Sequence, residues 1–184
     1  MTALTPPSSL AAETRLKPSA FISKHAQLIA SRITNPIADI ACGSGRNLLP
    51  FLQSGQRIDC YDIRPTCIDP YIVKACAQRL RRYEANLLDA NFSLPHAEYS
   101  LVLLIHFYNA GVVSQIIQAI KPGGLLVLET IDDRRGNYVE LPQLGEVFKL
   151  ITPRLHIVNC AAKPAGPNQQ RQVIKLIAEC PPKN

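Results

Sequence analysis

The stretch IADIACGSGRN, residues 37–47, places a carboxylate inside an apolar run and follows it with two glycines. The apolar run is typical of a short buried strand, and Asp39 lies within it. Gly43 and Gly45 carry no Cβ atom, so a polar ligand can approach the backbone there closely. These residue types in this order indicate a small polar ligand held after a strand, with Asp39 as one of its hydrogen-bonding partners.

Phosphate is one ligand to consider, because glycine loops between a strand and a helix can hold phosphate groups. A P-loop requires Lys and then Ser or Thr after its second glycine, whereas Gly45 is followed by Arg46 and Asn47. A dinucleotide-binding fingerprint requires a third glycine where this chain has Leu48. Both kinds of phosphate site therefore lack a required residue, and a turn with a purely structural role stays an alternative.

S-adenosylmethionine fits the pattern better, since it presents an amino-acid end, a ribose diol, an adenine and a sulfonium. Asp39 can bind the ammonium group directly or through water, and Gly43 and Gly45 can admit the amino-acid and ribose edges. A carboxylate at the end of the next strand can accept hydrogen bonds from both ribose hydroxyls. Asp62 stands there in IDCYDI, 17 residues after Gly45, whereas Asp59 has a less suitable position in the same strand.

The elements that would position these residues alternate between apolar strands and helices. Strands are predicted at 37–41, 57–63, 82–86, 99–107, 125–130, 154–160 and 172–180. Helices are predicted at 17–33, 47–55, 65–80, 110–120 and 143–151, with a start near Pro70 as an alternative for the third. This order predicts an α/β fold with a doubly wound, mostly parallel seven-stranded sheet. No helix separates the last two strands, so the last strand is predicted to run antiparallel. Ligands of such sheets bind at the carboxyl ends of the strands, where the glycines stand.

Residues 37–130 resemble a class I S-adenosylmethionine-dependent methyltransferase. IADIACGSGRN is similar to the family's first motif and YDI to its acidic second motif. ANLLDANFSLPHAEYSLVLL and AIKPGGLLVLET are similar to the later motifs, and the ACGSGRN variant is similar to the small tellurite-resistance-type branch. The resemblance implies a Rossmann-like methyltransferase fold. Residues 1–18 would then form an N-terminal arm that can move, and residues 19–184 a single methyltransferase domain.

The resemblance implies S-adenosyl-L-methionine as the cofactor and identifies the residues that would hold it. These cofactor-binding residues are Asp39, Ala41, Cys42, Gly43, Gly45, Asn47, Asp62, Ile63, Asn86, Leu87, Ile105 and His106. Two positions depart from the family pattern. Asn86 replaces an acid after the third strand, and Ser100 replaces an Asp in the fourth. The carbonyl of Asn86 can still accept a hydrogen bond from the adenine amino group.

Catalytic candidates follow the fourth strand in IHFYN, residues 105–109, which would face the methyl group. His106 could act as a general base or line the adenosine pocket, and Tyr108 could orient the substrate or pack as an aromatic ring. Glu129 would lie near the mouth of the site. Methyl transfer from a sulfonium mainly needs positioning and desolvation, and it needs a base only where the nucleophile carries a proton of high pKa.

A small-molecule acceptor is expected, because no insertion between the strands would form a substrate domain. Lys17, Ser19 and Phe21 are candidates to close over the cofactor, and Arg134 and Arg135 would lie on a loop over the site. The net charge of +6 permits a nucleic-acid substrate without indicating one. An RNA-modifying methyltransferase and a cofactor-binding protein with little turnover therefore stay open as alternatives.

The remaining composition bounds the environment of the protein. The six cysteines form no CxxC pair and no His stands at metal-ligand spacing from a Cys pair, so no metal site is expected. The longest apolar run, residues 101–105, is too short to span a bilayer, and the N-terminus lacks the pattern of a signal peptide. A cytoplasmic protein without membrane association is expected, and the sequence leaves its oligomeric state and its methyl acceptor open.

Overall fold

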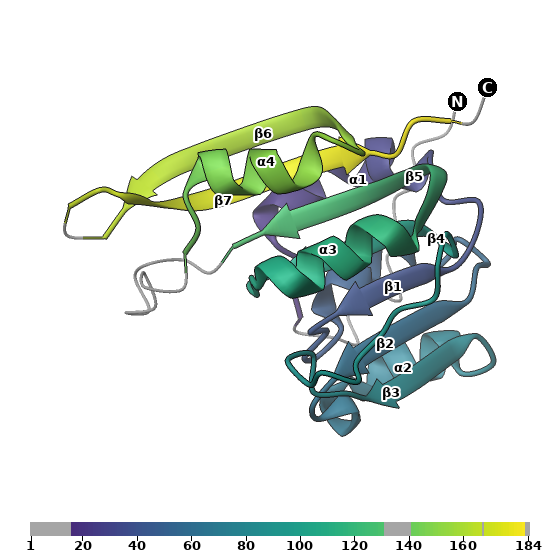
Figure 1. Cartoon of the computed structure of the whole chain (residues 1–184). Coiled ribbons are helices and arrows are strands. Elements are labelled where there is room, and N and C mark those ends of the chain that lie inside the picture. Colours follow the sequence, from purple (N-terminus) through teal and green to yellow (C-terminus); the bar gives the residue numbers. More distant parts are fainter. Residues whose placement is uncertain (1–15, 131–140, 167, 183–184) are drawn as a thin grey trace.

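Seven strands form one sheet in the order β3-β2-β1-β4-β5-β7-β6 (Figure 1). The computed structural model describes residues 16–130, 141–166 and 168–182. The strands are β1 (Ile37–Ile40), β2 (Ile58–Asp62), β3 (Leu80–Glu84), β4 (Tyr99–Ile105), β5 (Ile120–Glu129), β6 (His156–Ala165) and β7 (Arg171–Glu179). Only β7 runs antiparallel to its neighbours β5 and β6, while the other pairs are parallel. The predicted fold class, including the antiparallel last strand, is confirmed.

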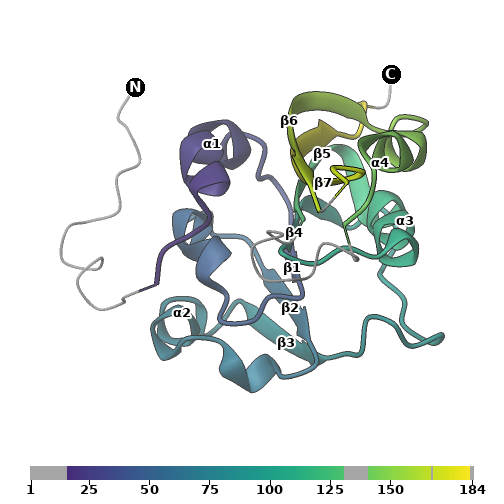
Figure 2. The same ribbon diagram turned by 90° about the vertical axis from the view of Figure 1, so that its left-hand side faces the viewer.

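Helices cover both faces of this sheet (Figure 2). They are α1 (Ala20–Ala30), α2 (Pro70–Cys76), α3 (Ala110–Ala119) and α4 (Leu144–Ile151), with short 3-10 helices η1 (Arg46–Phe51) and η2 (Pro65–Cys67). In Figure 2, α1 and α2 lie on one face and α3 and α4 on the other. None of the helices in the described part of the chain is long and apolar enough to span a membrane.

Alternating side chains of each strand divide the core into two apolar clusters. Ala38 and Ile40 of β1 pack in the cluster beneath α3 and α4, whereas Ile37 packs in the cluster beneath α1, η1 and α2. Because successive side chains on a strand point to opposite faces, Asp39 points to the same face as Ile37. The carboxylate singled out in the sequence therefore faces the α1 side of the sheet.

The start of α1 is fixed to the segment that follows the glycines. The Ser19 hydroxyl accepts a hydrogen bond from the backbone N–H of Ile22 at 3.1 Å, so Ser19 is the N-cap of α1. The backbone N–H of Ser19 donates to the Asn47 side-chain oxygen at 3.0 Å, and both residues are buried. Residues 1–15 of the expected arm lie outside the described residues, so the proposed domain boundary stays a prediction.

Two predicted helices are wrong in type or length. The segment 47–55 forms only the 3-10 helix η1, which contains Pro50 and ends at Phe51. Proline lacks the N–H that a longer α-helix would need at this position. The segment 65–80 divides into η2 and α2, because Ile68 is extended and Asp69 caps a new helix. This helix begins at Pro70, the predicted alternative start, and ends at Cys76.

Two segments that lie between predicted elements, 121–124 and 161–171, are partly strand. The KPGG segment lies inside β5, which starts directly after α3, and the β4–β5 pairing shifts register between Tyr99 and Leu101. Gly123 has a φ of 76° within that irregularity, so a bulge takes the place of the expected turn. β6 extends to Ala165 and includes Pro164, which is tolerated because β6 is an outer strand of the sheet.

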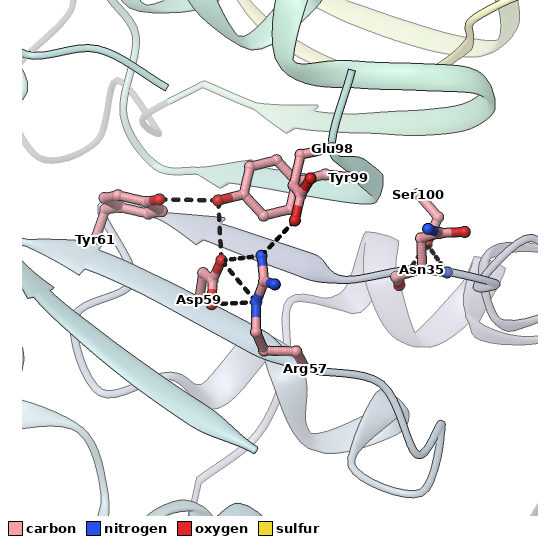
Figure 3. A network of polar contacts seen from close by, with 7 residues as sticks. All are labelled: Asn35, Arg57, Asp59, Tyr61, Glu98, Tyr99 and Ser100. Carbon is pink, nitrogen blue, oxygen red and sulfur yellow. Dashed lines mark hydrogen bonds and ion pairs between the residues drawn. The ribbon is translucent and has the colours of Figure 1, made fainter. Parts of the chain in front are cut away.

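Asp59 belongs to a polar network at the amino ends of the strands (Figure 3). Arg57 donates to both carboxylate oxygens of Asp59, at 3.0 and 2.9 Å, and also to Glu98 at 2.7 Å. The Tyr99 hydroxyl donates to Asp59 at 3.0 Å and bonds the hydroxyl of Tyr61 at 2.8 Å. Asp59 pairs in register with Ala38, so it lies on the α3 face, opposite to Asp39. Its role is structural.

Ser100 likewise supports the fold at the amino end of β4 (Figure 3). Its hydroxyl accepts from the backbone N–H groups of Thr34 and Asn35, at 3.3 and 3.0 Å, and donates to the Asn35 carbonyl at 2.7 Å. An ionised aspartate could accept the first two hydrogen bonds but could not donate the third. Ser100, which departs from the family pattern, therefore holds the segment that leads into β1. It lies at the end of the sheet opposite to the glycines.

Candidate functional site

The candidate site lies at the carboxyl edge of β1, where the strand order reverses between β2 and β4. Two residues other than glycine have left-handed backbones there: Ala41 with a φ of 56° after β1, and His106 with a φ of 63° after β4. Such conformations cost on the order of 1–3 kcal/mol each and cluster at functional sites. The backbone strain of this sheet edge therefore coincides with the glycine loop that the sequence singles out.

The two glycines of the loop have different surroundings. Gly43 has a φ of 52°, and a Cβ atom placed on it would meet no atom within 4 Å. Gly45 has a φ of 72°, and a Cβ atom there would lie 3.2 Å from Ile72 and 3.4 Å from Ile68. Gly43 thus borders open space that a ligand can use, whereas Gly45 lets the loop pack against the α2 segment.

Asp62 connects the end of β2 to the glycine loop. One of its carboxylate oxygens accepts from the Gly43 N–H at 2.8 Å, and the other accepts from the Arg64 N–H at 2.9 Å. Each oxygen keeps a second lone pair, which a ribose hydroxyl could use. The next residue, Ile63, exposes 61% of its surface and provides an apolar area beside that carboxylate.

Asp39 is buried beneath the loop, with 1% of its surface exposed, and its Oδ2 has no hydrogen-bond partner among the described residues. Burial and the nearby Asp62 charge raise the pKa of Asp39 to about 8, against the opposing effect of Arg46. An unsatisfied buried polar group costs roughly 1–3 kcal/mol, which a polar ligand or a water molecule at this position would recover.

Arg46 is a residue that the sequence analysis missed as a site residue. Its guanidinium donates to the Lys17 carbonyl at 3.1 Å and lies 3.3 Å from Nδ1 of His106. The other ring nitrogen of His106 lies 3.5 Å from Glu129. Arg46 thus links the chain before α1 to the residues that follow β4 and β5. Its position directly after Gly45 was the signal that could have identified it.

Glu129 is an ionised carboxylate at the end of β5, with 5% of its surface exposed. Burial alone would raise its pKa, but hydrogen bonding from His106, Lys175 and Ser19 outweighs burial and lowers the pKa to about 2. Lys175 is 2.5 Å from Glu129 Oε1. Glu129 Oε2 is buried and receives no hydrogen bond of normal geometry from the described residues. A chain of polar groups therefore runs Arg46, His106, Glu129, Lys175 along this edge.

The expected adenine-binding residues form the turn after β3. Asn86 accepts from the Leu88 N–H at 3.1 Å through its side-chain oxygen, and Leu87 is buried in the cluster beneath α3. The backbone N–H of Ala85 donates to the Asp62 carbonyl at 2.9 Å, which holds this turn beside the end of β2. The carbonyl oxygen of Asn86 has a second lone pair for an adenine amino group.

Other expected cofactor residues contribute packing and backbone. Cys42 and Ile105 are buried in the cluster beneath α1, and Ala41 packs against the opposite cluster. The Asn47 side-chain oxygen accepts a hydrogen bond from the Ser19 N–H and so positions the loop, and its contact with the cofactor stays a prediction. Phe21, a residue of α1, is buried in the same cluster as Cys42 and Ile105 and supports the core.

Tyr108 lies apart from the Arg46–His106–Glu129 chain. It lines a hollow with Ala110, Glu146, Lys149 and Leu150. Burial raises the pKa of Tyr108, and the charge of Glu146 adds to that effect. Within the described residues no hydrogen bond joins Tyr108 to the chain of polar groups. Arg134 and Arg135 lie outside the described residues. The described residues contain no group of three or more His, Cys, Asp or Glu side chains that could hold a metal ion.

No family model and no curated protein sequence matches this chain. Solved structures do match its fold. An S-adenosylmethionine-dependent methyltransferase from Mesorhizobium loti has a TM-score of 0.62 and 15% identity, over 88% of this chain and 98% of its own. A geranyl diphosphate C-methyltransferase from Streptomyces coelicolor A3(2), in complex with S-adenosyl-L-homocysteine, has a TM-score of 0.60 and 12% identity, over 86% and 77%.

The [4+2]-cyclase SpnF is similar to the same extent, with a TM-score of 0.59 and 12% identity over 87% of this chain and 81% of its own. Identities this low establish the fold alone. Membership of the tellurite-resistance-type branch therefore stays a prediction. The chain has the fold of the class I S-adenosylmethionine-dependent methyltransferases, with the glycine loop, Asp62 and Asp39 at the strand reversal of that fold.

Proposed function

We propose that the protein is an S-adenosylmethionine-dependent methyltransferase that acts on a small-molecule acceptor. The observation that carries the proposal is the contact between Asp62 and the Gly43 N–H, beside open space at Gly43. This contact joins the carboxylate at the end of β2 to the glycine loop that follows β1, at the carboxyl ends of the two strands. The buried, unpartnered oxygen of Asp39 on the same edge fits a ligand that carries an ammonium group.

The ribose, the ammonium group and the adenine of this cofactor each have a candidate partner among the described residues. Asp62 would accept from the ribose hydroxyls, and Asp39 would bind the ammonium group. The side-chain oxygen of Asn86 would accept from the adenine amino group, and the backbone N–H of Leu87 would donate to an adenine ring nitrogen. Ile63 would cover the adenine ring. When bound, S-adenosylmethionine supplies the activated methyl group. The chain then needs to exclude water and to hold the acceptor in line with the sulfur–methyl bond.

His106 would line the cofactor pocket and could also receive a proton from the acceptor. A guanidinium only donates hydrogen bonds, so the Nδ1 atom that faces Arg46 carries a lone pair. The proton of the neutral ring then lies on Nε2, toward Glu129. In this structure Arg46 covers the lone pair on Nδ1 of His106. This supports a role for His106 in lining the cofactor pocket more than a role as a general base.

A small molecule is favoured over RNA as the acceptor. The described residues hold no module beyond the sheet and its helices, and the Streptomyces coelicolor enzyme of the same fold is named for geranyl diphosphate. The basic doublet Arg81–Arg82 is exposed on β3, the outer strand of the sheet, where charges discourage pairing with another strand. Part of the positive charge therefore has a structural explanation.

The test is a methyl-transfer assay with labelled S-adenosylmethionine and a panel of thiols, phenols, amines and metalloid oxyanions. We expect one chemical class to yield a methylated product together with S-adenosylhomocysteine, and Gly43→Val protein serves as the inactive control. Product formed only with RNA would favour the RNA-modifying alternative instead. Tight cofactor binding without any product across the panel and RNA would favour a binding protein.

A further inference from the structure

The half-buried guanidinium of Arg46, beside the glycine loop, has no anionic hydrogen-bond partner among the described residues. Both contacts of Arg46 are to uncharged acceptors, the Lys17 carbonyl and the His106 ring. None of the ion pairs among the described residues includes Arg46. Arg57 shows the contrast, since it is paired with both Asp59 and Glu98. A planar guanidinium is best satisfied by a carboxylate or a phosphate, so within the described part of the chain Arg46 is available to an anionic group of a ligand.

Asp39 lies close enough to Arg46 for the guanidinium charge to favour the ionised form of its carboxyl group. The Arg46 charge lowers the pKa of Asp39, although burial keeps that pKa near 8. Asp39 Oδ2 is buried without a partner, and Gly43 borders open space four residues along the loop. A buried carboxyl oxygen without a hydrogen-bond partner and a guanidinium without an anionic hydrogen-bond partner therefore lie near one another among the described residues. A free α-amino acid carries the two groups that would complete this pair.

We propose that Arg46 binds the free α-carboxylate of the ligand, and that it leaves His106 to do so. The inference rests on the proposed function, because it takes the ligand to be the amino-acid end of S-adenosylmethionine. A hydrogen bond between a guanidinium and a carboxylate is charge-assisted at both ends, whereas its bond to an imidazole is not. The exchange of partners is therefore favourable once the carboxylate arrives.

The exchange has a consequence for His106. Arg46 now lies against Nδ1 of the ring, and Glu129 faces Nε2. The His106 backbone is held separately, since its N–H donates to the Glu129 carbonyl at 2.6 Å. Departure of Arg46 would leave the ring in place with an uncovered lone pair on Nδ1. Cofactor binding and the availability of His106 to a protic acceptor would thus be coupled through Arg46.

Three ligands test the proposal by calorimetry: S-adenosylhomocysteine, its decarboxylated analogue, and 5′-methylthioadenosine, which lacks the whole amino-acid end. We expect the wild-type protein to bind S-adenosylhomocysteine about 10- to 100-fold more tightly than the decarboxylated analogue. Arg46→Gln should remove this preference and leave the affinities of the two shorter ligands unchanged. Arg81→Gln, an exposed arginine on β3, is the matched control and should change no affinity.

Proton and nitrogen NMR of the histidine rings provides a second measurement, with His106→Asn used to assign the signals. S-adenosylhomocysteine should shift the Nδ1 signal of His106, whereas the decarboxylated analogue should not, and Arg46→Gln protein should show no such difference. If Arg46→Gln does not fold, Arg46→Lys is compared across the same three ligands, and its preference for the carboxylate should fall.

Two results would overturn the inference while leaving the proposed function intact. In the first, S-adenosylhomocysteine binds and Arg46→Gln weakens all three ligands equally, which would mean that Arg46 only anchors the segment at Lys17. In the second, Arg46→Gln retains the wild-type preference for the carboxylate. Failure of folded wild-type protein to bind any of the three ligands would overturn the proposed function and this inference together.

Discussion

Gly43→Val protein is expected to fold and to lose at least about 100-fold in affinity for S-adenosylhomocysteine. The valine side chain would enter the space beside Gly43 in which no protein atom lies within 4 Å of a Cβ position. A residue with a Cβ atom at a φ of 52° also costs roughly 1–2 kcal/mol of backbone strain, which a folded domain can sustain. Calorimetry measures the affinity, and urea denaturation measures the free energy of unfolding.

The matched control for this change is Gly145→Val. Gly145 lies in α4, and a Cβ atom there also meets nothing within 4 Å, but its backbone is helical. We expect this variant to bind S-adenosylhomocysteine as the wild type does. Gly45 is unsuitable for the same test, because a side chain there would clash with Ile72 and Ile68. A loss of affinity could then come from a displaced loop and not from a blocked ligand site. Folded Gly43→Val protein with normal affinity would mean that the loop is only a structural turn.

Asp62→Ala is expected to weaken S-adenosylhomocysteine binding about 10- to 100-fold, since hydrogen bonds to a charged group contribute about 1.5–3 kcal/mol. The variant loses the acceptor for the ribose hydroxyls and also the contact that holds the Gly43 N–H. Asp62→Asn retains one acceptor oxygen, so its loss of affinity should be smaller. Calorimetric titration of the three proteins gives the order of their affinities.

Asp59→Asn is the matched control from the same strand. Asp59 bonds Arg57 and Tyr99 on the opposite face of the sheet, so this change should lower the free energy of unfolding by about 1–3 kcal/mol. Affinity for S-adenosylhomocysteine should stay at the wild-type value. If Asp62→Ala instead leaves the affinity unchanged, Asp62 only closes the turn between Gly43 and Arg64, and the ribose site must lie elsewhere.

Much of the sheet could be predicted because its strands are marked locally. Continuous apolar runs at β1 and β4 are typical of strands buried on both faces, and both are fully buried. The absence of a helix between β6 and β7 identified the antiparallel hairpin. The position of Asp62 in the candidate site could also be predicted, because Asp62 is the last residue of β2. Ligands of a sheet built from alternating strands and helices bind at the carboxyl ends of its strands.

The missed features depend on contacts between distant segments. Lys175 meets Glu129 because β7 inserts beside β5 with these two residues in register, and nothing near either residue indicates that pairing. Arg46 meets His106 and Lys17 only when the ends of β1 and β4 and the start of α1 converge. The sequence showed only that Ser100 departs from the family pattern. Its structural role could not be predicted, because its partner Asn35 stands 65 residues earlier in the chain.

Errors in the predicted elements have local causes that residue patterns do not resolve. The KPGG segment has turn residues, yet it continues β5 through a bulge at Gly123. Pro164 usually argues against a strand, but β6 has a neighbour on only one side, so the missing N–H is tolerated. In both cases the position of the strand within the sheet decides the conformation, and that position is a property of the whole fold.

Calorimetric titration of the wild-type protein with S-adenosylhomocysteine tests the central claim most directly. The proposed site predicts saturable binding at one site per chain. A ligand at 100 times its dissociation constant should also raise the free energy of unfolding by about 2.7 kcal/mol, visible as a higher melting temperature. NAD and ATP, titrated in the same way, should not bind. No heat with S-adenosylhomocysteine, together with clear binding of NAD or ATP, would contradict the account.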